Sequence, residues 1–149
     1  NIDNEKLKKI QSSLFIVYSG IERNSEKIIE DQQKELNIFE AYDQIKAIGK
    51  SSVDYLRTGD VGKLGRSMDN HWEIKRRINK TISNSTIDRM YIELKSFGSI
   101  GGKIIGAGGG GFFLMVVEKN KKKFILKAKE ANYKFVNFQF ESKGAHIVA

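Results

Sequence analysis

A dense glycine tract is the part of the sequence best suited to chemistry. Seven of the chain's 14 glycines lie between Gly101 and Gly111, in the run GGKIIGAGGGG. Each glycine inside regular structure costs about 0.5–1 kcal/mol relative to alanine, so a tract of this density is poor filler. Glycine is favoured where φ is positive or where a ligand approaches the backbone closely. Successive amides in such a loop form an anion-binding nest, and phosphate is the ligand we expect there.

Two common phosphate motifs do not fit the tract. Gly106, Gly108 and Gly111 satisfy the bare GxGxxG spacing, but a dinucleotide site needs a helix directly after the glycines. Residues 112–117 instead read FFLMVV, which predicts a fully buried strand. The Gly-Lys pair at 62–63 lacks both the following Ser or Thr and the preceding glycine of a Walker A loop. A plain glycine-rich hairpin is the alternative, although it accounts for only a few of the glycines.

Side chains that carry nucleophilic or metal chemistry are scarce. The chain has no Cys and only two histidines, His71 and His146, which excludes a thiolate zinc site and a three-histidine metal site. We therefore expect no metal site in this chain. His71 is typical of a partly buried helix residue rather than a catalyst. Asp69 and Asp88 fall on expected helices, where capping or salt bridges are the commoner roles.

The formal net charge of +8 favours a polyanionic partner, such as nucleic acid, anionic lipid or a phosphorylated small molecule. The densest lysine cluster begins at Lys119, where Phe124, Ala128 and Ala131 recur at helical spacing. We interpret this cluster as the solvated face of a helix. The longest wholly apolar run has six residues and the chain opens on polar residues. We thus expect no membrane span, no secretory signal and a cytoplasmic protein.

Hydrophobic periodicity predicts the elements that must position the glycine tract. Strands are expected at 13–19, 103–105, 112–117 and 133–141, with a further edge strand at 145–148. Helices are expected at 24–36, 38–56, 61–78, 85–97 and 121–131. Ser85, followed three residues later by Asp88, is expected to cap the fourth helix. In the strand at 133–141, the alternation predicts that Val136, Phe138 and Phe140 face the core.

The order of these elements is strand, several helices, strand, strand, helix, strand. It predicts an α+β fold with a split βαβ (ferredoxin-like) antiparallel sheet, whose first crossover is enlarged by a helical insertion. No internal repeat and no Pro/Ser linker interrupts the chain, so residues 1–149 are expected to form one domain. The chain opens without Met, which suggests a fragment of a longer protein.

At this point the tract resembles the third, C-terminal motif of the GHMP kinases (galactokinase, homoserine, mevalonate and phosphomevalonate kinases), usually written G-A-K-x-T-G-A-G-x-G-G. Two departures are visible: Gly101-Gly102 stands where Gly-Ala is usual, and Ile105 replaces the common Thr. Other segments resemble the branch that phosphorylates D-glycero-D-manno-heptose 7-phosphate. These segments are LFIVYSGIER at 14–23, WEIKR at 72–76, ISN at 82–84 and Ile87-Asp88. The resemblance covers nearly the whole chain in the right order.

The resemblance implies the C-terminal domain of an ATP-dependent sugar kinase, a phosphotransferase with an alcohol acceptor. In that family the N-terminal domain carries the nucleotide loop P-x-x-x-G-L-G-S-S-A and the catalytic acidic residue. This chain has no proline, so that loop is not in it. ATP and Mg²⁺ are then expected to be bound mainly by the N-terminal domain, which becomes a partner of this chain. The chain alone is expected to be inactive.

The resemblance also implies site residues. The loop expected beside the transferred phosphoryl group is Gly106, Ala107, Gly108, Gly109, Gly110 and Gly111. Lys103 matches the lysine of the motif, with a surface lysine at a strand end as the equal alternative. A heptose 7-phosphate needs a cation near its phosphate, and Lys75 and Arg76 are the candidates. The alternative there is Trp72 as a core residue with the neighbouring cations in solvent.

Three other functions stay open at this stage. A basic split βαβ fold is also typical of an RNA recognition motif, although such modules need solvent-facing aromatics on the two central strands. A regulatory domain of the same fold would bind a small molecule without chemistry. Another GHMP sugar kinase would act on fucose or galactose. The kinase interpretation places the parent protein in cell-surface (lipopolysaccharide) heptose synthesis in bacteria, with a sugar phosphate as substrate; a homodimer is an open alternative.

Overall fold

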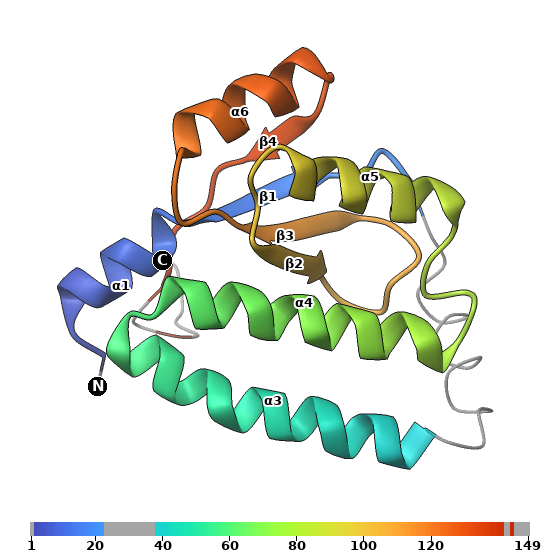
Figure 1. The fold of residues 1–149 in the computed structure, drawn as a ribbon, viewed down its shortest axis with the longest axis horizontal. Coiled ribbons are helices and arrows are strands. Elements are labelled where there is room, and N and C mark those ends of the chain that lie inside the picture. Colours follow the sequence, from blue (N-terminus) through green and yellow to red (C-terminus); the bar gives the residue numbers. More distant parts are fainter. Residues whose placement is uncertain (1, 23–37, 142–143, 145–149) are drawn as a thin grey trace, which may run out of the picture.

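A computed structural model of the chain describes residues 2–22, 38–141 and 144. Its centre is a four-stranded antiparallel sheet in the order β2-β3-β1-β4 (Figure 1). The strands are β1 (Leu14–Tyr18), β2 (Gly101–Ile104), β3 (Phe112–Val116) and β4 (Lys134–Val136). This order confirms the predicted α+β fold with a split βαβ sheet. The last strand is shorter than expected, and the predicted edge strand at 145–148 lies outside the described residues.

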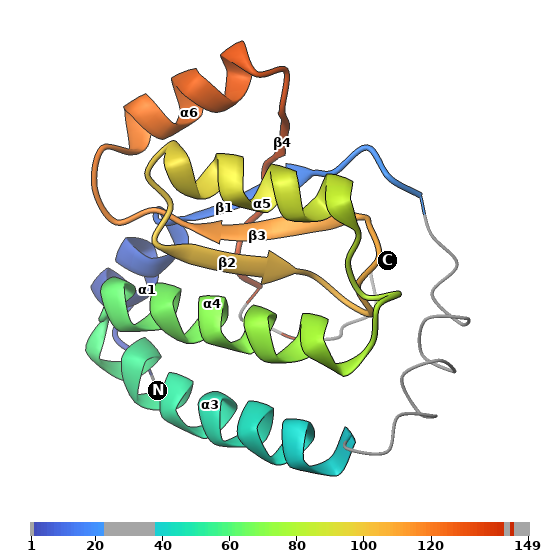
Figure 2. The ribbon, with the colours of Figure 1, turned by 45° about the vertical axis from the view of Figure 1, so that its right-hand side comes forward.

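Five helices are described in the same part of the chain. They are α1 (Asn4–Gln11), α3 (Ile38–Thr58), α4 (Val61–Ile78), α5 (Ser85–Ser96) and α6 (Lys121–Glu130). The predicted helix at 24–36 lies outside the described residues. In Figures 1 and 2, α4 runs along the β2 edge of the sheet, α3 lies beside α4, and α5 crosses one face of the sheet. The enlarged first crossover is therefore confirmed.

The helix ends follow from local capping, with one correction to the sequence prediction. Asn84, not Ser85, is the N-cap of α5, and its side chain accepts hydrogen bonds from the amides of Thr86 and Ile87. An Asn side chain satisfies two otherwise unpaired amides here. The helix α1 was not predicted. It begins after Asp3, whose carboxylate accepts from the amides of Glu5 and Lys6.

Two apolar clusters lie on the two faces of the sheet. On the first face, buried residues of α4, α5 and α6 pack against the strands. The largest of these fully buried side chains include Trp72, Phe113 and Phe124. On the second face, a smaller cluster joins α1 and the first turns of α4 to one end of the sheet, through Ile10, Leu14, Val61, Leu64 and Val116.

The second face is only partly covered, which corrects two predictions. Phe112 is 39% exposed, so β3 is not fully buried as its apolar run suggested. Val136 is 43% and Phe140 40% exposed, whereas Phe135 packs against the first cluster. Phe138 packs against the second cluster, so the prediction is right for Phe138 and wrong for Val136 and Phe140. The strand β4 ends at Val136, so the alternation of a strand does not continue to residue 141.

Glycines bring α4 unusually close to β2. A Cβ on Gly101 would overlap the carbonyl oxygen of Gly65 and lie 2.7 Å from Cβ of Asp69. A Cβ on Gly102 would overlap the carbonyl oxygen of Leu114. The Gly-Gly pair that departs from the usual Gly-Ala of the motif is thus required by packing at both positions. This contact fixes the strand that leads directly into the glycine loop.

Candidate functional site

The glycine loop joins β2 to β3 and takes a backbone path open mainly to glycine. Gly106, Gly108, Gly109, Gly110 and Gly111 all have positive φ, between 74° and 154°. L-residues with a Cβ rarely adopt such angles, which explains why the tract contains so many glycines. A simple two- or three-glycine turn would not need five residues with positive φ within six positions.

The loop is anchored to two other segments of the chain. The amide of Gly109 donates to the carbonyl of Ile82 at 2.7 Å, and the amide of Gly111 donates to the carbonyl of Ile21 at 3.0 Å. A Cβ on Gly108 would lie 2.8 Å from Cγ2 of Ile82, and one on Gly110 would lie 2.6 Å from the carbonyl oxygen of Ile21. These contacts hold the loop in one shape, so its remaining groups are preorganised.

The anchoring reduces the number of loop amides that can bind a phosphate. The amides of Gly109 and Gly111 donate hydrogen bonds to protein carbonyls, so these two amides are not available to a phosphate. The amides of Gly106 and Gly110 donate to no acceptor within the described part of the chain. The predicted series of adjacent free amides is thus replaced by separate donors. The expectation that the loop borders a phosphoryl group stays a prediction.

Three basic side chains gather beside the loop. Lys75 of α4 donates from Nζ to the carbonyl oxygen of Gly106, the first glycine of the loop. Nζ of Lys103 on β2 lies 3.4 Å from Nδ1 of His71, one turn before Lys75 on α4. Burial, followed by repulsion from Lys103 and Lys75, lowers the pKa of His71 to about 4. Burial also lowers the pKa of Lys103. Lys103 and Lys75, both predicted site residues, therefore lie together, and His71 joins them.

Arg76, the other predicted phosphate ligand, is already paired with carboxylates. Its Nη2 lies 2.8 Å from Oε2 of Glu73, and its Nη1 lies 3.2 Å from Oδ1 of Asp88. Asp88 also accepts a hydrogen bond from the hydroxyl of Ser83 at 2.7 Å. The expectation that Asp88 forms a salt bridge rather than acting as a catalyst agrees with this geometry. Trp72 is fully buried in the first cluster, as one of the two interpretations of this helix required.

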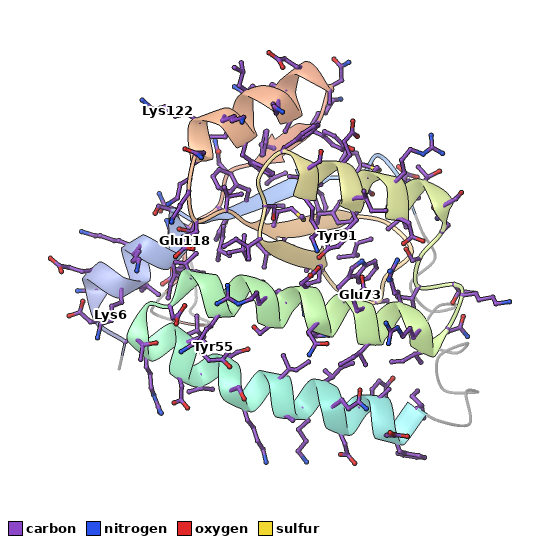
Figure 3. All side chains as sticks on the ribbon, viewed as in Figure 1. Lys6, Tyr55, Glu73, Tyr91, Glu118 and Lys122 are labelled. Atoms are coloured by element: carbon purple, nitrogen blue, oxygen red, sulfur yellow. The ribbon has the colours of Figure 1, made fainter. Side chains whose placement is uncertain are left out.

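A buried tyrosine that was not predicted as a site residue links α5, α4 and β2. The hydroxyl of Tyr91 donates to Oδ1 of Asp69 and accepts from the amide of Gly102 at 3.1 Å. Lys95 completes the group with Nζ 2.8 Å from Oδ2 of Asp69. Burial, and then the hydrogen bond to Asp69, raises the pKa of Tyr91. Figure 3 shows Tyr91 between α5 and α4. The amphipathic spacing of α5 gave no sign of this polar contact.

The side chains and helices of the described residues also bear on metal binding and on membrane insertion. Within residues 2–22, 38–141 and 144, no group of three or more His, Cys, Asp or Glu side chains is arranged to hold a metal ion. None of the described helices combines the length and the apolar character needed to cross a bilayer.

Comparison with known proteins identifies the family. The family model described as the C-terminal region of GHMP kinases matches residues 52–134, which is more than half of the chain. The chain belongs to the GHMP kinase family. The match includes α4, the glycine loop and the strands β2 and β3 on either side of it, so the resemblance of the glycine tract to the third motif is confirmed at family level. Kinases of this family use ATP. No curated protein sequence matches the chain significantly.

Solved GHMP kinase structures share the fold. The mevalonate kinase of Methanococcus jannaschii superposes with a TM-score of 0.74 at 22% identity, over 91% of this chain and 42% of that protein. A D-glycero-D-manno-heptose 1-phosphate kinase from Bacteriodes thetaiotaomicron superposes with a TM-score of 0.62 at 20% identity, over 94% of this chain and 36% of that protein. A putative sugar kinase from Campylobacter jejuni superposes with a TM-score of 0.62 at 24% identity, over 95% of this chain and 40% of that protein. The chain thus spans about two fifths of the length of these kinases.

Proposed function

We propose that residues 1–149 form the C-terminal domain of an ATP-dependent kinase that phosphorylates a hydroxyl of D-glycero-D-manno-heptose 7-phosphate or a related sugar. Membership of the GHMP kinase family supports the reaction class. The resemblance of four short segments to the heptose kinase branch, together with a heptose 1-phosphate kinase among the structural neighbours, supports the sugar. The family match favours this function over an RNA-binding module.

The observation that carries the proposal is the anchored glycine loop with basic side chains at its edge. The loop suits the end of a triphosphate, because the amides of Gly106 and Gly110 have no acceptor among the described residues and its glycines leave room for a close approach. ATP supplies the phosphoryl group, which passes to the acceptor hydroxyl as its bond to ADP breaks. Such transfers depend mainly on positioning and on stabilising charge around the phosphoryl oxygens. The loop amides and the ammonium of Lys75 supply both here.

Other parts of the reaction are assigned to the rest of the protein. The described residues offer no cluster of carboxylates for Mg²⁺, and we propose that Mg²⁺, the adenine nucleotide and the residue that accepts the hydroxyl proton are held mainly by an N-terminal domain. That domain is then the main partner of this chain. We place the reaction in the cytoplasm, in the synthesis of cell-surface heptose.

The experiment is a substrate panel with the full-length protein. ATP-dependent phosphorylation is measured on heptose 7-phosphate, heptose 1-phosphate, galactose, fucose and mevalonate. We expect the highest kcat/KM on a phosphorylated heptose. A preference for galactose or fucose would move the protein to another sugar kinase branch, and a preference for mevalonate would refute the sugar kinase function.

A further inference from the structure

Lys103 is a half-buried cation whose charge is not balanced by any carboxylate among the described residues. It lies on β2, and its register partner is Leu114, which in turn pairs with Ile16 on β1, so all three share the second face of the sheet. Within the described residues, no carboxylate lies within salt-bridge distance of its ammonium group. Among the described residues, its Nζ contacts the ring of His71, 3.4 Å from Nδ1. A buried charge without a counterion is costly, which makes this position favourable for a bound anion.

The imidazole of His71 adds a donor to the same place. With its pKa lowered to about 4, the ring is neutral near pH 7. The ammonium of Lys103 has only hydrogens to offer, so Nδ1 of His71 must accept and the ring proton must sit on Nε2. His71 then presents an N–H group beside two ammonium groups. Lys103 and His71 then both offer donors at this place, and Lys103 brings a positive charge that no described carboxylate pairs with.

The chemistry and position of the cluster define its ligand. Lysines act as point charges toward phosphate, and a phosphate ester carries enough charge and acceptor oxygens to engage several donors. Lys75 joins the cluster directly to the glycine loop through the carbonyl of Gly106. By contrast, Arg76 is neutralised by Glu73 and Asp88. A phosphate in this cluster would therefore lie next to the place proposed for phosphoryl transfer.

We propose that Lys103 and His71, with Lys75 at their border, form a binding site for the phosphate that the acceptor sugar already carries. This assignment rests on the proposed function and gives it a substrate class: the acceptor is a sugar phosphate rather than a free sugar. The competing source of the same chemistry is the terminal phosphate of ATP. The two sources differ in which substrate loses affinity when the site is removed.

The test uses Lys103→Met in the full-length protein, since methionine keeps most of the side-chain volume and removes the charge. We expect KM for the sugar phosphate to rise about 10–100-fold, as for loss of charged hydrogen bonds. KM for ATP should stay close to that of the unchanged protein. Lys103→Arg should restore part of the affinity. The matched control is Lys122→Met on α6, which Figure 3 places far from the C-terminal half of α4.

Two results would overturn this site: an unchanged KM for the sugar phosphate in a folded Lys103→Met protein, or a rise in KM for ATP instead. A binding measurement separates it from the proposed function. The ring resonances of His71 are followed by NMR while inorganic phosphate or the sugar phosphate is added. Shifts that vanish in Lys103→Met support the phosphate site even if no substrate in the panel is phosphorylated. Absence of shifts contradicts it even if the kinase is active.

Discussion

Alanine in place of Gly110 is expected to lower kcat of the full-length protein about 100-fold, because a displacement of about 1 Å at a reacting centre has an effect of this size. Gly110 has a φ of +154°, and a Cβ there would lie 2.6 Å from the carbonyl oxygen of Ile21. That carbonyl also holds the amide of Gly111. The loop must therefore shift, and the donors beside the phosphoryl group move with it. Steady-state kinetics measure the effect.

The matched control for this substitution is Gly98→Ala. Gly98 has a φ of +118° at the end of α5, but nothing lies within 4 Å of the added Cβ. It carries backbone strain of the same kind without disturbing the glycine loop. We expect it to lower thermal stability and leave kcat near that of the unchanged protein. If Gly110→Ala stays folded with unchanged turnover, the loop is only a connector between β2 and β3.

The 149-residue chain by itself is expected to transfer no detectable phosphate from ATP to any sugar. It spans about two fifths of the solved kinases that share its fold. It also has no proline, and so lacks the nucleotide loop that the resemblance assigns to the N-terminal domain. Loss of substrate positioning alone removes several kcal/mol of transition-state stabilisation, and our proposal places the nucleotide site in the N-terminal domain.

The measurement compares the purified chain with the full-length protein at equal concentration, using labelled ATP and the sugar panel. The chain should still fold, because each face of its sheet carries an apolar cluster. A cooperative thermal transition checks this. Phosphorylation by the folded chain alone would show that the nucleotide and the catalytic residue are bound here, contrary to our assignment.

Local signals were sufficient for most of the fold. The apolar spacing of α3 and α4 is strongly periodic, and Gly59, with a φ of +69°, ends α3 where the sequence placed the break. The order of strands and helices then left few ways to build the sheet. The helix α1 was missed because its single buried residue, Ile10, gives a weak pattern.

The C-terminal strand shows where periodicity fails. Phe135 and its neighbour Val136 are both apolar, and alternation alone does not say which of them faces the core. The contact of Phe135 with Phe15 and Phe124, at centroid separations of 6.2 Å and 6.1 Å, decides the matter. Both partners are distant in sequence, so the assignment needed the tertiary structure.

Most of the residues of the site could be predicted from the sequence, but their contacts with one another could not. The glycine tract is visible from its composition, and Lys103 and Lys75 were both predicted as site residues. Their meeting with His71 depends on how closely α4 packs against β2, which the glycines at 65 and 101 allow. The pairing of Arg76 with Asp88 spans the turn between α4 and α5 and was likewise not visible in the sequence.

The most direct measurement follows the glycine amides of the full-length protein, labelled with ¹⁵N-glycine, while AMPPNP and the sugar phosphate are added together. We expect the resonances of Gly106 and Gly110 to shift at saturation, because their amides have no acceptor in residues 2–22, 38–141 and 144. The resonance of Gly98, at the end of α5, should not shift. Unchanged resonances of Gly106 and Gly110 in the doubly bound protein would contradict a role for this loop at the site of phosphoryl transfer.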